Sequence, residues 1–166
     1  MRQSLYLILF LTAVALQAYW GRVFGWEADF ILAALITLAF FARASEIIFI
    51  SALAVFWLSW NPSLAREIIL IALFPLLWAF LGKQIPVHRA LIHFFAVIAS
   101  IALFYVLVNA GELSAIAVGT LLKDIAVSSV CAVAMYQLLR PAHASDGKGR
   151  MTLFTALLHD GQRNRI

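Results

Sequence analysis

Apolar residues occur in six runs along the chain, and most charged residues lie between these runs or in a C-terminal tail. A helix needs about 20 residues, with a range near 17–25, to cross the hydrocarbon core of a bilayer. The second and third runs are shorter than this and need their flanking residues to cross. We therefore predict six transmembrane helices, over residues 4–20, 28–42, 47–60, 64–81, 90–108 and 114–139.

The second and third runs could instead form one helix, because only four residues separate them. A single helix over 28–60 would be about 50 Å long at 1.5 Å per residue. The hydrocarbon core is only about 30 Å thick. One helix would also place Arg43 and Glu46 near its middle, so we favour a helical hairpin.

The basic residues provide a separate indication of topology. Lysine and arginine gather on the cytoplasmic side of membrane proteins. With six spans and a cytoplasmic N-terminus, the outer segments contain only Arg22 and Arg66, and Lys123 lies within a span. The other basic residues are then cytoplasmic: Arg2, Arg43, Lys83, Arg89, Arg140, Lys148, Arg150, Arg163 and Arg165. We therefore expect both termini in the cytoplasm.

Composition agrees with this picture. Hydrophobic residues make up 64% of the 166 residues and charged residues 12%. Soluble domains have roughly 45–50% apolar and about 25% charged residues. The net charge of +4 is explained by basic loops at a membrane, so nucleic acid is not expected as a partner. The single cysteine, Cys131, excludes an internal disulfide framework and any multi-thiolate metal site.

Two regions follow from the pattern: a six-helix transmembrane domain over 1–140 and a basic cytoplasmic tail over 141–166. Within the tail, Met151, Phe154, Leu157 and Leu158 fall on one side of a short helical segment. We expect this segment to lie at the interface beside anionic lipid, or to dock on a cytoplasmic partner.

The last apolar run carries the most informative polar residues. Lys123 and Asp124 lie roughly ten residues into it, where an ionisable group is costly and usually faces the bundle or a wet cavity. At about 100° per residue, Asp124 and Ser128 share a face with small or polar residues, namely Ala117, Thr120 and Cys131. Such a face either contacts a partner or substrate or packs against a neighbouring helix. Lys123 can extend to the interface.

Two further acidic residues are candidate contacts near the predicted outer side: Asp29 at the start of the second span and Glu67 in the first turns of the fourth. We expect His93 to be an interfacial group near the cytoplasmic end of the fifth span. His88 and His93 have neither i,i+3 nor i,i+4 spacing, so no metal site is expected. We also expect no catalytic residues and no cofactor, because nucleophile–base pairs and phosphate-binding loops are not found in the sequence.

Short stretches of the sequence resemble a known family. The second span opens Trp26-Glu27-Ala28-Asp29-Phe30-Ile31-Leu32, similar to a proline-aspartate-apolar motif, with Asp29 at the aspartate. The third span ends Trp57-Leu58-Ser59-Trp60 before Asn61-Pro62. The last span ends Tyr136-Gln137-Leu138-Leu139-Arg140, similar to a tyrosine, leucine-leucine-arginine ending. Over residues 1–140, the chain resembles the rod shape-determining membrane protein MreD family.

This resemblance implies a non-catalytic, multi-pass scaffold of the bacterial inner membrane that serves cell shape and cell-wall elongation. The partners that it implies are a bitopic MreC-like protein, the wall synthases, an actin-like cytoplasmic filament and the membrane lipids. It also implies an architecture similar to the substrate-binding components of energy-coupling-factor transporters.

Two other functions remain open from the sequence. A substrate-binding component of a vitamin-type transporter would gather polar and aromatic residues in an outer pocket, for which Trp20, Trp26, Trp57 and Trp60 are available. Interfacial belts explain the same tryptophans. An intramembrane enzyme would need acidic residues on one leaflet, and Asp29, Glu67 and Glu112 are all near the outer side.

Overall fold

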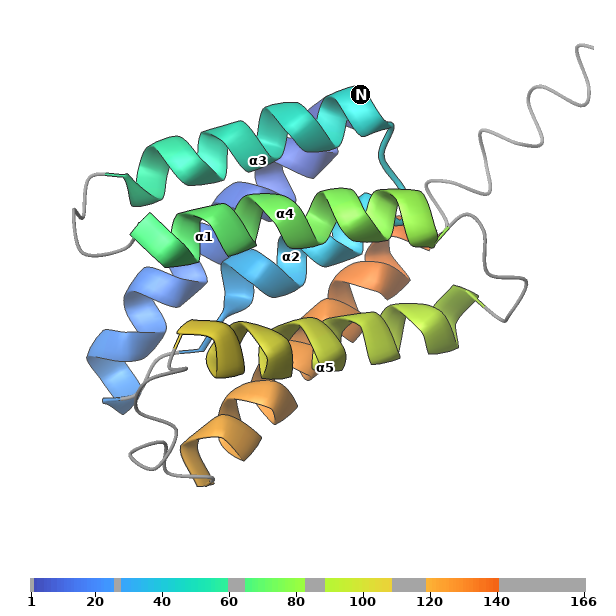
Figure 1. Ribbon diagram of the computed structural model, residues 1–166. Helices are drawn as coiled ribbons and strands as arrows, with labels where there is room; N and C mark the ends of the chain where they lie inside the picture. Colours follow the sequence, from blue (N-terminus) through green and yellow to red (C-terminus); the bar gives the residue numbers. More distant parts are fainter. Residues whose placement is uncertain (1, 26–27, 60–64, 83–88, 109–118, 141–166) are drawn as a thin grey trace, which may run out of the picture. The chain divides into compact units, whose positions relative to one another are not determined.

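The computed structural model describes residues 2–25, 28–59, 65–82, 89–108 and 119–140, and the regular structure in these residues is α-helical (Figure 1). Six helices are present in this part of the chain: α1 (Arg2–Phe24), α2 (Phe30–Ala39), α3 (Ala44–Leu58), α4 (Ala65–Leu81), α5 (Arg89–Val108) and a last helix, Gly119–Arg140. The chain divides into two compact units, Met1–Tyr136 and Gln137–Ile166. The packing described below is that of the first unit.

Three of the helices are long and apolar enough to cross a membrane: Gln3–Phe24 within α1, α5 and the last helix. The other three are shorter apolar helices. The prediction of an all-α chain with membrane-length helices is therefore confirmed.

The second and third predicted spans form two helices joined by a turn, but their boundaries differ from the prediction. The second helix covers only Phe30–Ala39. The third begins at Ala44, so residues predicted to separate the spans instead form its first turn. The reason is local capping: the Glu46 carboxylate accepts a 2.8 Å hydrogen bond from the Arg43 backbone N–H. This contact satisfies one of the unpaired N–H groups at the start of a helix.

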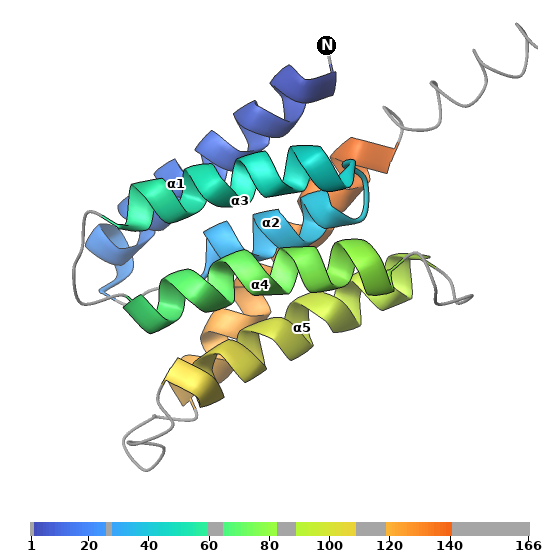
Figure 2. The same cartoon turned by 45° about the horizontal axis from the view of Figure 1, so that its top comes forward.

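Helix α2 forms the core of the bundle, and all ten of its residues are buried. Its sequence, Phe-Ile-Leu-Ala-Ala-Leu-Ile-Thr-Leu-Ala, is apolar on every side, and such a helix must be covered by protein or lipid all round. It contacts α1, α3, α4 and α5. Helices α3, α4 and α5 pack side by side in chain order, as Figure 2 shows.

Contacts at the two ends of α2 give the directions of its neighbours. Gln17, near the end of α1, bonds to Ile31 at the start of α2, whereas Tyr6, near the start of α1, bonds to Phe41 just beyond its end. Helix α1 is therefore antiparallel to α2. The last helix is parallel to α2, because Asp124 contacts the residue before α2 and Tyr136, twelve residues later, packs against Phe41 at 5.0 Å between ring centroids.

Helix α4 is continuous from Ala65 to Leu81 although Pro75 lies inside it. Its C-terminal turn is tied to two neighbours. The Trp78 indole N–H donates a 2.7 Å hydrogen bond to the Ser100 hydroxyl of α5. Gly82 follows the helix, and a Cβ there would lie 3.0 Å from the Phe40 ring, so the glycine allows α4 to end against the turn that follows α2.

Candidate functional site

Asp124 is the most completely buried charged residue in the described part of the chain, with 0% exposure. Its Oδ1 accepts two hydrogen bonds, from the Asp29 backbone N–H at 2.9 Å and from the Ser128 hydroxyl at 2.8 Å. Its Oδ2 is also buried, and no hydrogen-bond donor among the described residues reaches it. The carboxylate thus connects the last helix to the start of α2.

These contacts satisfy backbone groups at the start of a buried helix. The first four N–H groups of an α-helix have no partner within the helix, and at a buried helix start other groups of the protein must supply one. The Gln17 side-chain oxygen accepts the Ile31 N–H at 2.9 Å, while the side chain of Asp29, the residue before α2, makes no capping hydrogen bond. Side chains from α1 and the last helix therefore cap α2. The partial positive charge at a helix start also favours the Asp124 carboxylate there.

The structure brings three of the predicted contact residues together, Asp29, Asp124 and Ser128. The other two lie elsewhere. Lys123 is exposed on the last helix, and Glu67 is half-buried in the first turn of α4. On the predicted small and polar face, Ser128 is fully buried, Cys131 is half-buried and Thr120 is exposed. Ala117 lies outside the described residues.

A second buried polar contact lies near the other end of α2. The Thr37 hydroxyl donates to the Ala33 carbonyl at 2.7 Å and lies 2.9 Å from His93 Nε2. A hydroxyl has one proton, so it accepts the second hydrogen bond, and His93 Nε2 is the donor. The imidazole also packs against Phe40 and Tyr136, with ring centroids 5.5 and 4.7 Å away.

His93, expected to be an interfacial group, lies inside the bundle. Its side chain is 1% exposed. Its position near the start of α5 suggested a place at the membrane surface, but α5 packs antiparallel to α2 and places His93 beside the buried C-terminal turn of α2.

Sequence reasoning did not identify Gln17 and Thr37 as members of these two contacts. Each is a polar residue with apolar neighbours on both sides, which is a weak signal because threonine in a helix often bonds only to a preceding carbonyl. Among the described residues, no group of three or more His, Cys, Asp or Glu side chains could hold a metal ion.

A groove of about 500 Å³ lies between α5 and the last helix. Its walls are almost entirely apolar and include Phe94, Ile98, Ala126, Val130 and Val133. Ser129 also lines it. This hydroxyl is buried and has no hydrogen-bond partner within the described ranges.

Comparisons with known proteins give no relative: no family model, no curated protein and no solved structure matches the chain.

Proposed function

We propose that the protein is a non-catalytic scaffold of the bacterial inner membrane that holds a single-span partner within the cell-wall elongation machinery. The observation that carries this proposal is the groove between α5 and the last helix. Membrane helices associate through small residues that allow close approach and through hydrogen bonds from serine. Ala126 and Ser129 supply these features in the groove.

The buried Ser129 hydroxyl points to the chemistry of the partner. Leaving a buried polar group without a hydrogen bond costs about 1–3 kcal/mol. A partner helix carrying a serine, threonine or asparagine opposite Ser129 would remove this cost. Ser128, Thr37 and His93 already bond within the bundle, and Asp124, whose Oδ2 is also without a donor among the described residues, does not line the groove.

The resemblance to the MreD family, which rests on sequence alone, suggests the identity of such a partner, a bitopic MreC-like protein. In the same proposal, all six helices cross the membrane and both termini lie in the cytoplasm. The antiparallel packing of α1 and α5 against α2 supports alternating crossings.

Photo-cross-linking in native membranes tests the proposal. The photoreactive amino acid replaces Val130, which lines the groove and is 71% exposed. We expect a cross-link to a bitopic coiled-coil protein. The matched position is Ile69 on α4, which is 66% exposed and does not line the groove, and we expect no such cross-link there.

Two serines provide a second comparison. Ser129 and Ser51 are both buried, and neither hydroxyl has a hydrogen-bond partner in the described part of the chain. Ser129→Ala should lower the yield of the Val130 cross-link, whereas Ser51→Ala on α3 should leave it unchanged. Equal yields for the two variants, or cross-links from Ile69 to the same protein, would contradict the proposed groove.

The alternative function is that of a substrate-binding component of a vitamin-type transporter. Two of the four tryptophans proposed for its pocket are described. Trp20 stacks on Phe24 and packs edge-on against Phe30, and Trp57 is 61% exposed. These positions favour packing and interfacial roles over a common pocket. Recovery of an ATPase module without cell-wall proteins would favour the transporter.

A further inference from the structure

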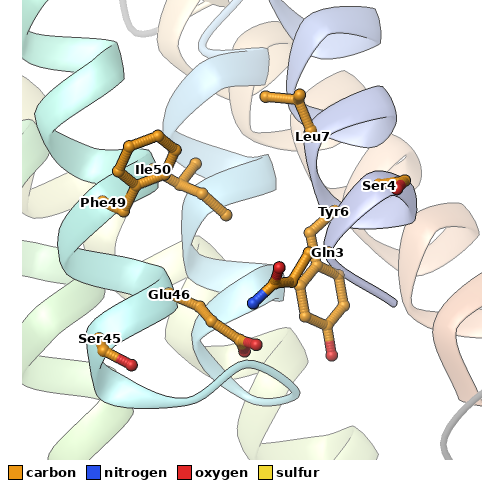
Figure 3. Close-up of a pocket in the computed structure, with 8 residues that line it drawn as sticks. All are labelled: Gln3, Ser4, Tyr6, Leu7, Ser45, Glu46, Phe49 and Ile50. Atoms are coloured by element: carbon orange, nitrogen blue, oxygen red, sulfur yellow. The ribbon is translucent and has the colours of Figure 1, made fainter. Parts of the chain in front are cut away.

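A second groove, of about 460 Å³, lies between the N-terminal turns of α1 and α3 (Figure 3). Its polar lining residues are Gln3 and Ser4 on α1, and Ser45 and Glu46 on α3. The floor includes Tyr6, whose hydroxyl donates a hydrogen bond to the Phe41 carbonyl at 3.2 Å.

The lining changes from polar to apolar along both helices. Ser45 and Glu46 belong to the first turn of α3, and Phe49 and Ile50 lie one turn further along. On α1, the apolar Leu7 follows one turn after Ser4 in the same way. Because helix ends lie at the membrane surface and the following turns enter the hydrocarbon, the groove has the polarity of a phospholipid, with its headgroup outermost.

The short length of the groove argues against a partner helix as its occupant. It is lined by residues 3–7 of α1 and 45–50 of α3, which correspond to about 8–9 Å along a helix axis. A transmembrane helix crosses about 30 Å of hydrocarbon and would make contacts well beyond two turns. A lipid headgroup with the upper part of one acyl chain has the matching extent.

The negative charge of the groove lining indicates which kind of lipid headgroup fits. Within the described part of the chain, Glu46 is the only charged residue that lines the groove. One of its oxygens accepts the Arg43 N–H, and no cation forms an ion pair with it among the described residues. Figure 3 shows the carboxylate extending toward Gln3 and Tyr6. An ammonium group placed there would complement this charge.

We propose that the α1–α3 groove binds a phospholipid with a primary-amine headgroup, of the phosphatidylethanolamine type. Its ammonium group bonds to Glu46, its phosphate accepts hydrogen bonds from Ser4 and Ser45, and an acyl chain packs on Leu7 and Phe49. This site is independent of the proposed partner groove between α5 and the last helix.

Native mass spectrometry of the purified full-length chain tests the site without any partner protein, so its result is separate from that of the cross-linking experiment. The probes are phosphatidylethanolamine and phosphatidylglycerol with identical acyl chains. We expect the wild type to retain more phosphatidylethanolamine. Equal retention of the two lipids, or a preference for phosphatidylglycerol, would overturn the ammonium–Glu46 contact.

Glu46→Gln is the informative charge variant, because glutamine can still accept the Arg43 N–H and preserve the start of α3. We expect it to lower phosphatidylethanolamine retention by up to about fivefold, the upper end for one solvent-exposed ion pair, and to leave phosphatidylglycerol retention unchanged. Asp160→Asn, which removes the same charge in the tail, should behave as the wild type. Unchanged retention in Glu46→Gln contradicts the proposal.

Two phenylalanines test the acyl-chain part of the site. Phe49 in the groove is 67% exposed and Phe95 on α5 is 63% exposed, so truncation of either removes a similar apolar surface. Phe49→Ala should reduce lipid retention and Phe95→Ala should not. The helical content of each variant, measured by circular dichroism, shows that the fold is preserved. Equal retention in the two variants would place the lipid outside this groove.

Discussion

At the residue scale, Asp124 shows how a bilayer protein keeps a carboxylate in its interior. The ionised group is expensive to bury, but its Oδ1 accepts hydrogen bonds from the Asp29 N–H and the Ser128 hydroxyl. The carboxylate also lies at the positive end of α2. An ionisable residue in the middle of the last helix could be predicted to face the bundle. Its partner could not be predicted, because Asp29 N–H is a backbone group 95 residues away.

Substitutions at Asp124 separate its hydrogen bonds from its charge. Asp124→Leu leaves the Asp29 N–H and the Ser128 hydroxyl without an acceptor, and we expect a loss of about 2 kcal/mol in the free energy of unfolding. Asp124→Asn keeps an acceptor and should lose less, mainly the attraction to the helix dipole of about 0.3–1 kcal/mol. Thermal unfolding in detergent, followed by circular dichroism, measures both.

Recovery of the partner by pull-down shows whether Asp124 has a role beyond stability. We expect Asp124→Leu to insert into the membrane but to recover less partner, because the last helix forms one wall of the partner groove. Equal stability of the Leu and Asn variants would show that the capping contact contributes little, and unchanged recovery would limit Asp124 to internal packing.

At the element scale, α2 depends on the helices around it. A ten-residue helix is marginal alone, and at about 15 Å it is half as long as the hydrocarbon core is thick. Packing covers all of its residues, and the side chains of Gln17 and Asp124 satisfy N–H groups at its start. The sequence pattern predicted a helix over 28–42, but its shortening at both ends follows from the turn at Phe40–Arg43 and from capping by remote residues.

The end of α1 provides a test at the same scale. Gly25 follows this helix with φ = +70°, a conformation that costs other residues roughly 1–2 kcal/mol, and its N–H bonds to the Gly21 carbonyl. Gly25→Ala should therefore lower the free energy of unfolding by about 1 kcal/mol. Gly119→Ala is the matched control, because a Cβ meets no atom within 4 Å at either glycine and only Gly25 has a positive φ. An equal effect of the two substitutions would contradict the backbone explanation.

At the scale of the whole molecule, the helix directions agree with a chain that crosses the membrane repeatedly. Helices α1 and α5 run antiparallel to α2, and the last helix runs parallel to it. This is the order expected when consecutive helices alternate in direction. The proposed six crossings, with both termini in the cytoplasm, lead to a direct labelling experiment.

The single cysteine makes this experiment simple, because Cys131→Ser removes the only native thiol. In that background, we expect Asn109→Cys, in a predicted outer segment, to react with an impermeant maleimide in right-side-out vesicles. Asp146→Cys, in the predicted cytoplasmic tail, should react only after the vesicles are permeabilised. Labelling of both thiols in intact vesicles would contradict the six-crossing topology.

The sequence by itself indicated a helical membrane protein, because six long apolar runs with charged residues mainly between them are typical of helices in a bilayer. It also identified Asp124 as a residue expected to face the bundle or a wet cavity. Only the tertiary structure decided that α2 is the core, that Asp124 caps it and that His93 is buried. The physical reason is that an apolar run is equally suited to contact with lipid and to contact with other helices. The neighbours of a residue and its hydrogen-bond partners depend instead on how helices far apart in the chain pack.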